Sequence, residues 1–210
     1  YNAVPYDWRM SADYILDEGI KLRDKNIDLV QTVQDLQKKS KTGKVTLITH
    51  SNGGLVAKQL ILELQKSGLD TMIDKIIFVA MPEYGTAQAI TALVFGHNQS
   101  VAGGLIMRSS IASELAKNMP TAYTLLPSEK YYELNENADR LLQETVIRNY
   151  SRVNPGLLDK AKNMHRQLDN LVYSKDTNIF QIIGTGINTL TNIELDDKNL
   201  FKNFRLTYFI

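Results

Sequence analysis

The strongest chemical signal in the sequence is a serine between a strand pattern and a helix pattern. Residues 49–54 read THSNGG, and Ser51 follows the short apolar run that ends at Thr49. A serine between a strand and a helix is the setting of a G-x-S-x-G nucleophile elbow, in which a strained turn lifts the hydroxyl clear of the sheet. The sequence therefore predicts that Ser51 is a catalytic nucleophile.

The residues around Ser51 fit this prediction with one departure. The backbone N–H of Asn52 is expected at the helix start, where unpaired donors and the helix dipole stabilise a developing oxyanion. Gly53 lets strand and helix approach, whereas Thr49 stands where the motif has glycine and needs more room. Adjacent residues on a sharp turn point apart, so we interpret His50 as a packed core histidine and not as the base for Ser51.

A structural alternative exists for Ser51, because serine is a favoured residue at the N-cap of a helix. A cap explains neither the paired glycines after Ser51 nor the strand before it.

The elements that must position Ser51 form a strand–helix–strand series. A buried-strand run at 44–49 is followed by a helical period over 54–64 and a second strand run at 75–80. Strands joined by one helix in this way are parallel. The series therefore predicts an α/β fold built on a mostly parallel sheet.

The rest of the chain is organised around this series. A surface helix is expected from Ile27 to Leu36, after turn-like residues that follow Arg9. Strand texture returns at 178–183, and the tail 187–210 is loop-like until the apolar run 206–210. Between the strands lie helical patterns, near 100–118, 135–149 and 156–173. We expect 1–83 and 176–210 to form an incomplete core and 84–175 to form a helical cap or lid.

Composition excludes several classes of function. The 24 basic and 23 acidic side chains give a net charge of +1, so no field gathers nucleic acid. The sequence has no cysteine and three histidines, and we expect neither a metal site nor a cofactor. No apolar run is long enough for a membrane span, and the chain is expected to be soluble.

Four blocks in order carry a family resemblance. They are VPYDWR at 4–9, LITHSNGGLV at 47–56, PEYGTA at 82–87 and NMPTAYTLLPS at 118–128. Together they resemble the lecithin:cholesterol acyltransferase-like α/β-hydrolases, and IGTG at 183–186 with Thr189 is similar to the glycine-rich strand end of that family. The resemblance implies an α/β-hydrolase fold with a helical cap, and hydrolysis or transfer of lipid acyl esters through a serine acyl-enzyme on Ser51.

Other residues in these blocks have a functional and a structural interpretation. Tyr84 lines an acyl pocket in the functional interpretation, while Gly85 is required by the conformation of the turn. Trp8, beside Asp7 and Arg9, is interpreted as a lock of its loop against the core. Apolar positions of the cap could hold an acyl chain, although core packing is the commoner role; these are Val101, Leu105, Ile106, Ile111 and Leu115.

The acid and the base of a triad are not evident. The resemblance places the acid in a Gly-Asp-Gly-Thr-Val-like loop, but Asp196 and Asp197 lie in a polar tail without that motif. The last histidine, His165, falls in a helical pattern of the cap. We expect the acid and the base outside these 210 residues, and little esterase activity from this chain alone.

The alternative to an enzyme is a non-catalytic binding or scaffold domain that kept the elbow. The expected partner is a lipid or another ester, with transient contact between the cap and a membrane surface. An extracellular or membrane-peripheral location would suit that chemistry.

Overall fold

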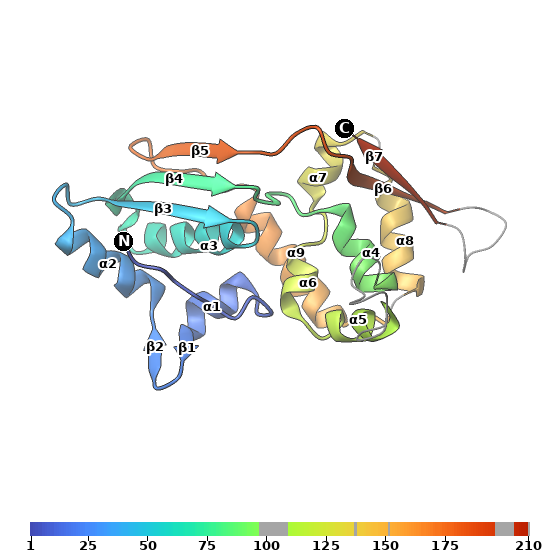
Figure 1. Ribbon diagram of the computed structural model, residues 1–210, viewed down its shortest axis with the longest axis horizontal. Helices are drawn as coiled ribbons and strands as arrows, with labels where there is room; N and C mark the ends of the chain where they lie inside the picture. The colour runs from blue at the N-terminus through green and yellow to red at the C-terminus, as the bar shows by residue number, and fades with distance from the viewer. Residues whose placement is uncertain (97–108, 137, 151, 196–203, 210) are drawn as a thin grey trace. The chain divides into compact units, whose positions relative to one another are not determined.

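The computed structural model describes residues 1–96, 109–136, 138–150, 152–195 and 204–209 (Figure 1). The chain divides into two compact units. The first comprises Tyr1–Glu83 and Gln167–Gly184, and the second comprises Tyr84–Arg166 and Thr185–Ile210.

A parallel sheet organises the first unit. Its strands are β3 (Val45–His50), β4 (Ile73–Val79) and β5 (Asn178–Ile182), in the order β3-β4-β5 (Figure 1). Helix α3 (Gly53–Lys66) and the 3-10 turn η1 (Asp70–Met72) connect β3 to β4. The predicted α/β class and the predicted strand–helix–strand series are confirmed.

Helices pack against this sheet through apolar stripes. Helix α2 (Leu29–Lys39) begins where the Asp28 side chain accepts a hydrogen bond from the Gln31 N–H at 2.9 Å, and it buries Leu29 and Val33. Helix α3 buries a wider stripe, which includes Leu55, Leu60, Ile61 and Leu64. Ile76 and Phe78 of β4 are buried as well. These side chains form the core that holds the carboxyl ends of the strands in place.

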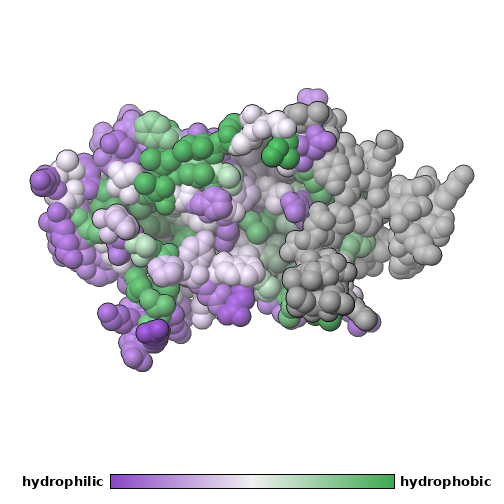
Figure 2. Space-filling model, viewed as in Figure 1, coloured by the Kyte–Doolittle hydropathy of each residue, from purple (hydrophilic) through white to green (hydrophobic). Residues whose placement is uncertain are grey.

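The sheet also exposes apolar side chains. Ile48 of β3 pairs with Ile77 of β4, which pairs with Phe180 of β5, and the exposed fractions of Ile48 and Phe180 are 72% and 50%. Figure 2 shows hydrophobic residues gathered over the strands of this unit. Parallel sheets are normally covered on both faces, so this is an unusual surface for such a sheet.

The residues before α2 contain more structure than the sequence indicated. Helix α1 (Ala12–Glu18) and the hairpin of β1 (Ile20–Leu22) and β2 (Lys25–Ile27) occupy a stretch that was predicted to be turn-like. Elements this short show less than two periods of any pattern. Their formation depends on burial of Ala12, Ile15 and Ile20, which the sequence pattern alone did not reveal.

The second unit is mainly helical. Its described elements are α4 (Ala87–Phe95), α5 (Ser109–Ala116), α6 (Pro120–Thr124), α7 (Glu129–Leu134), α8 (Arg140–Tyr150), most of α9 (Pro155–Leu168), and the antiparallel strands β6 (Thr189–Leu195) and β7 (Phe204–Phe209). The prediction of a helical block without strands between β4 and β5 is confirmed for the described residues. The prediction of a loop at the start of the tail is wrong, because residues 189–195 pair with the terminal strand.

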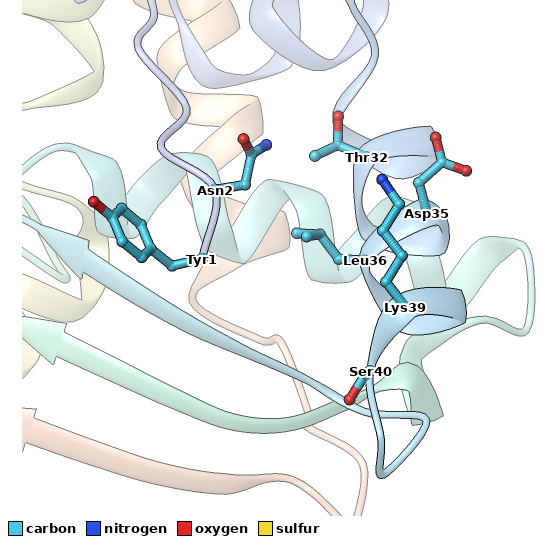
Figure 3. A pocket seen from close by; sticks show the side chains of 7 residues that line it. All are labelled: Tyr1, Asn2, Thr32, Asp35, Leu36, Lys39 and Ser40. Atoms are coloured by element: carbon cyan, nitrogen blue, oxygen red, sulfur yellow. The ribbon is translucent and has the colours of Figure 1, made fainter.

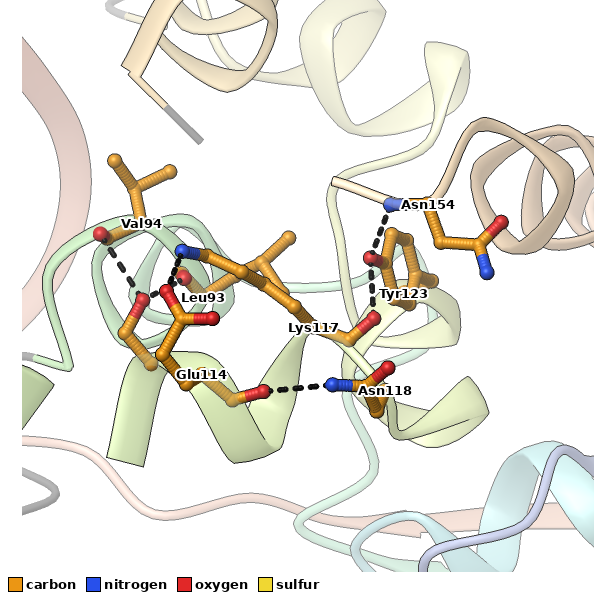
Figure 4. Close-up of polar contacts among 8 residues, drawn as sticks. Leu93, Val94, Glu114, Lys117, Asn118, Tyr123 and Asn154 are labelled. Carbon is orange, nitrogen blue, oxygen red and sulfur yellow. Dashed lines mark hydrogen bonds and ion pairs between the residues drawn. The ribbon is translucent and has the colours of Figure 1, made fainter. Parts of the chain in front are cut away.

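Tyr123 lies at the centre of the second unit. Its side chain is fully buried in a cluster with Ile90, Leu93 and Val146. Its hydroxyl donates to the Lys117 carbonyl oxygen and accepts from the Asn154 N–H, both at 2.8 Å (Figure 4). These bonds join α6 to the ends of α5 and α9, so one aromatic residue fixes three helices.

A buried amide connects the helices of this unit to the β6 strand. The Gln143 side chain is fully buried, and its Nε2 donates to Asn192 Oδ1 at 3.1 Å. The Tyr132 hydroxyl donates to Gln143 Oε1 at 3.0 Å. Both ends of the buried amide are thus hydrogen-bonded, which favours packing of β6 against these helices.

Gly85 begins the second unit in a tight turn. Its φ is +82°, and a Cβ there would lie 2.9 Å from Pro127 Cα and would collide with the Leu126 carbonyl group. The neighbouring residues are fixed by bonds from Thr86 N–H to Leu125 O and from Ser128 N–H to Tyr84 O, both 2.9 Å. The prediction that the conformation requires glycine at this position is confirmed.

Gly85→Ala should lower the free energy of unfolding by about 3 kcal/mol or more, because the new methyl group meets backbone that cannot rotate away. Gly68→Ala is the matched control, since Gly68 also has a positive φ of +69° but has no atom within 4 Å of the place that a methyl group would take. In this control, we expect the free energy of unfolding to fall by about 1 kcal/mol. Chemical denaturation measures the free energy of unfolding of both variants. Equal losses would contradict a collision of the new methyl group at residue 85.

Tyr132 should make the second unit sensitive to alkaline pH. Burial, with smaller effects from nearby Tyr131 and Glu144, raises the pKa of the Tyr132 phenol above its usual value of 10.0. The stability that depends on the protonated phenol is therefore present below pH 10 and is lost as pH rises towards the folded-state pKa.

In Tyr132→Phe, we expect the free energy of unfolding to be about 1 kcal/mol lower at neutral pH, because Gln143 Oε1 loses its donor. Above pH 10, the free energy of unfolding of this variant should fall less steeply with pH than that of the wild type, by up to ~1.4 kcal/mol per pH unit. Urea denaturation between pH 7 and pH 11.5 tests this, and parallel pH profiles would show that the phenol does not titrate with unfolding.

Candidate active site

Ser51 occupies a sharp turn between β3 and α3. Its φ is +51°, in the left-handed region that residues other than glycine rarely adopt. Its N–H donates to the Val79 carbonyl oxygen of β4 at 2.9 Å, and its own carbonyl oxygen accepts from the Gly54 N–H at 2.9 Å. The predicted tight turn and strained serine backbone are confirmed.

The structure does not support the interpretation of Ser51 as a helix cap. The N-cap of α3 is Asn52, and α3 begins at Gly53. A serine that only capped the helix would have extended backbone angles, whereas Ser51 has left-handed ones. The strain is therefore unexplained by helix capping, and strained backbone of this kind gathers at functional sites.

The glycines after Ser51 differ in their steric role. A Cβ on Gly53 would meet the Tyr6 hydroxyl at 3.5 Å and Thr49 Cβ at 3.9 Å, which are ordinary contacts. A Cβ on Gly54 would overlap the side chain of Met81, and Met81 Cβ would lie only 3.0 Å away. The close approach that the sequence argument assigned to Gly53 thus occurs at Gly54.

Tyr6 contacts the elbow from the N-terminal segment. Its half-buried position raises the pKa of its phenol, and a side-chain hydrogen bond with Asn52 partly opposes that rise. The Asn52 side chain is thereby held while its backbone N–H stands at the start of α3. Sequence reasoning missed this contact, although Tyr6 lies within the first block of the family resemblance.

Trp8 and His50 were both interpreted as packed residues, and both interpretations are wrong. The exposed fraction of Trp8 is 61%, and the neighbouring Asp7–Arg9 ion pair, 2.6 Å long, lies at the surface. His50 is exposed at the end of β3, because it follows Ile48 on the uncovered face of the sheet. Neither aromatic side chain stabilises the core.

The second unit contains the other candidates. Tyr84 is half-buried, and its place in an acyl pocket stays a prediction. His165 is buried, with Nε2 2.8 Å from the Thr124 carbonyl oxygen, to which it can only donate. Ile111 and Leu115 of α5 are about half exposed, so they do not pack into the core. The remaining candidates lie outside the described residues: Val101, Leu105, Ile106, Asp196 and Asp197. The third histidine of the sequence, His97, lies outside them too.

Two hollows flank β3 and α2. One is a groove of about 690 Å³ along the outer edge of β3, which reaches Thr49, His50 and Gly53 beside the elbow. Its apolar lining comes mainly from Val4, Leu29, Val33, Leu36, Val56 and Leu60. The other, of about 590 Å³, is polar and lies between Tyr1, Asn2 and α2 (Figure 3). Only the groove reaches residues that flank Ser51.

Within the described part of the chain, no cluster of three or more His, Asp or Glu side chains could hold a metal ion. No helix in that part is long and apolar enough to cross a bilayer.

The elbow and its flanking blocks match a known family. The sequence profile of the lecithin:cholesterol acyltransferase family matches residues 1–202. The chain belongs to this family. The resemblance inferred from the four blocks is therefore confirmed. The family name denotes the transfer of an acyl group from a lipid. A sequence search of curated proteins found no match.

Among solved structures, a chain in the crystal structure of the Tle4–Tli4 complex is similar to this chain. The identity is 18% and the TM-score is 0.46, over 82% of this chain and 42% of that chain. This chain thus spans less than half the length of that one.

Thr49 occupies the glycine position of the elbow motif with a buried hydroxyl. Thr49 Oγ1 has no hydrogen-bond partner among the described residues. Thr49→Val keeps the shape and removes the unsatisfied group, so we expect the free energy of unfolding to rise by about 1 kcal/mol.

Thr46→Val on the same strand is the matched control. Thr46 Oγ1 donates to Asp74 Oδ1 at 2.9 Å. Its removal should lower the free energy of unfolding by about 0.5–1 kcal/mol. Thermal or urea denaturation gives both values, and a loss of stability in Thr49→Val would show that its hydroxyl has a partner.

Proposed function

We propose that the protein hydrolyses or transfers the acyl group of a lipid ester through a covalent intermediate on Ser51. The observation that carries the proposal is the left-handed backbone of Ser51 between a parallel strand and a helix. That strain has a use if the hydroxyl must stand clear of the sheet to reach a substrate. Membership in the lecithin:cholesterol acyltransferase family supports the choice of an acyl ester as substrate.

The reaction has two steps. A base takes the proton of Ser51 Oγ while the oxygen attacks the ester carbonyl, and the leaving alcohol departs with that proton. Water or an acceptor alcohol then attacks the acyl-serine carbonyl and gives its proton to the base, which returns it to Ser51 Oγ as the acyl group leaves as an acid or a new ester. The backbone N–H of Asn52, at the start of α3, is the proposed donor to the oxyanion in both steps.

The base and the acid are proposed to lie outside these 210 residues. The unit that holds Ser51 contains one histidine, His50, which is the last residue of β3, is exposed and is adjacent to Ser51 in the chain. Adjacent residues on this turn point apart, so His50 is not the base. We further propose that residues 84–175 form a cap over the site, that Tyr84 contacts the acyl chain, and that the cap contacts the lipid surface.

The direct activity test uses the protein at its full natural length. With a short-chain nitrophenyl ester and with phospholipid vesicles, we expect acyl release or transfer that falls at least ~10³-fold in Ser51→Ala. Thr49→Val is a matched control at the same turn that leaves the hydroxyl of Ser51 in place. Equal rates in wild type and Ser51→Ala would favour a binding or scaffold domain instead.

The 210-residue chain alone should turn over the ester no faster than its own Ser51→Ala variant. A serine hydroxyl without a base within about 2.6–3.2 Å is a weak nucleophile at neutral pH. The assay is the same nitrophenyl ester hydrolysis. Turnover well above the variant would mean that His97, His165 or a second chain supplies the base.

A further inference from the structure

Helix α3 carries a buried lysine two turns after the elbow. The side chain of Lys58 is 3% exposed, and its Nζ lies 3.1 Å from Glu83 Oε1. A lysine this deeply buried is rare unless it is paired, and the carboxylate of Glu83 helps to stabilise a charge at this place. The reaction proposed for Ser51 does not use either group.

Glu83 also reaches the neighbouring strand. Its second oxygen, Oε2, accepts a hydrogen bond from Gln181 Nε2 of β5 at 3.1 Å. The carboxylate therefore bridges α3 and β5, and it lies in the segment 80–83 that leaves the end of β4. This segment is fixed at its far end by two side chains from different elements.

The same segment touches the elbow directly. At its near end, the Val79 carbonyl oxygen accepts from the Ser51 N–H, and the Ala80 N–H donates to Ile182 O at 2.9 Å. Ala80 has a φ of +47°, which is a second strained backbone next to that of Ser51. Met81 packs against Gly54 so closely that no Cβ fits there. Movement of 80–83 would therefore move the first turn of α3.

The Lys58–Glu83 pair is partly buried, because Lys58 is enclosed while Glu83 is 27% exposed, and burying charge costs free energy. Well-packed apolar side chains of similar size are often at least as stabilising, because two charges need not be desolvated. An ion pair does fix geometry more sharply, since a carboxylate with both oxygens bonded has one orientation. The arrangement suits a segment that must hold two strained residues in place.

We propose that Lys58 and Glu83 are positioning residues for the elbow. Their ion pair holds the segment 80–83 against α3, and through Met81 and Val79 it fixes the turn that presents Ser51 Oγ and the Asn52 N–H. The positioning role rests on the proposed function for its use in catalysis, but its structural part is measurable without any activity.

Hydrogen exchange followed by mass spectrometry tests the structural part. In Glu83→Gln and in Lys58→Met, we expect exchange of the amides at 51–56 to rise about tenfold or more, with little change in the β1–β2 hairpin. Glu83→Gln should have the larger effect, because it removes the negative charge 3.1 Å from the buried lysine. The matched control is Lys66→Met on the same helix, which breaks the exposed Lys66–Glu63 pair of 2.6 Å and should leave 51–56 unchanged.

The double variant Lys58→Met/Glu83→Gln keeps the proposal falsifiable if a single variant fails to fold. It buries no charge, so it should fold, yet its exchange at 51–56 should stay as high as in the weaker single variant. Wild-type exchange at 51–56 in the double variant would overturn the proposal. So would an increase spread evenly over the chain, because that would show a general loss of stability.

Kinetics of the full-length protein test the catalytic part of the proposal. In Glu83→Gln and Lys58→Met, we expect kcat for the nitrophenyl ester to fall about tenfold with little change in KM, because a displaced oxyanion donor affects the transition state. Unchanged kcat alongside faster exchange at 51–56 would overturn the catalytic use of the ion pair. If the wild-type protein hydrolyses no ester, the proposed function fails, and the exchange data alone decide the positioning of the elbow.

Discussion

The structure depends on how a strained serine is held at the end of a parallel strand. A left-handed backbone at a residue with a side chain costs about 1–3 kcal/mol, and it persists only where the surroundings over-determine it. Here the Ser51 N–H bonds to Val79 O of the neighbouring strand, and the Ser51 carbonyl oxygen accepts the Gly54 N–H of the following helix. The turn is thus fixed on both sides by backbone that belongs to the core of its unit.

The constraint at Ser51 explains residues that would otherwise look unrelated. Gly54 has no side chain because Met81 fills that space, and Met81 belongs to the segment that continues β4. Tyr6 closes the same turn from the N-terminal segment through its bond with Asn52. The elbow is therefore supported from several elements of one unit, as a site that needs exact placement of an oxygen atom requires.

The sequence predicted those parts that depend on local patterns. The β-branched run before Ser51, the helical period after it and the paired glycines together determine the turn, and they are visible without a structure. Gly85 could be predicted for the same reason, because a turn between two elements restricts its own residues. The short hairpin of β1 and β2 gave too few residues for a period to show. The β6 strand is as long as β4, but a register irregularity between Leu190 and Asn192 interrupts its alternation.

Contacts between distant residues could not be predicted in this way. Lys58 and Glu83 are 25 positions apart, and a charged residue on a helix is usually exposed, so nothing in the sequence marks Lys58 as buried or pairs it with Glu83. His50 and Trp8 were misjudged for the opposite reason. Their types suit a core. Whether His50 at the end of β3 is covered depends on where helices pack, and Trp8 lies in a turn of the N-terminal segment, outside the sheet.

The most direct test of the central claim is covalent capture of the nucleophile. The full-length protein would be incubated with a fluorophosphonate, digested, and mapped by mass spectrometry. The account predicts a phosphonyl group on Ser51, and no labelled peptide in the Ser51→Ala variant. Labelling of another residue in the wild type, or labelling that persists in Ser51→Ala, would contradict the assignment of Ser51 as the nucleophile.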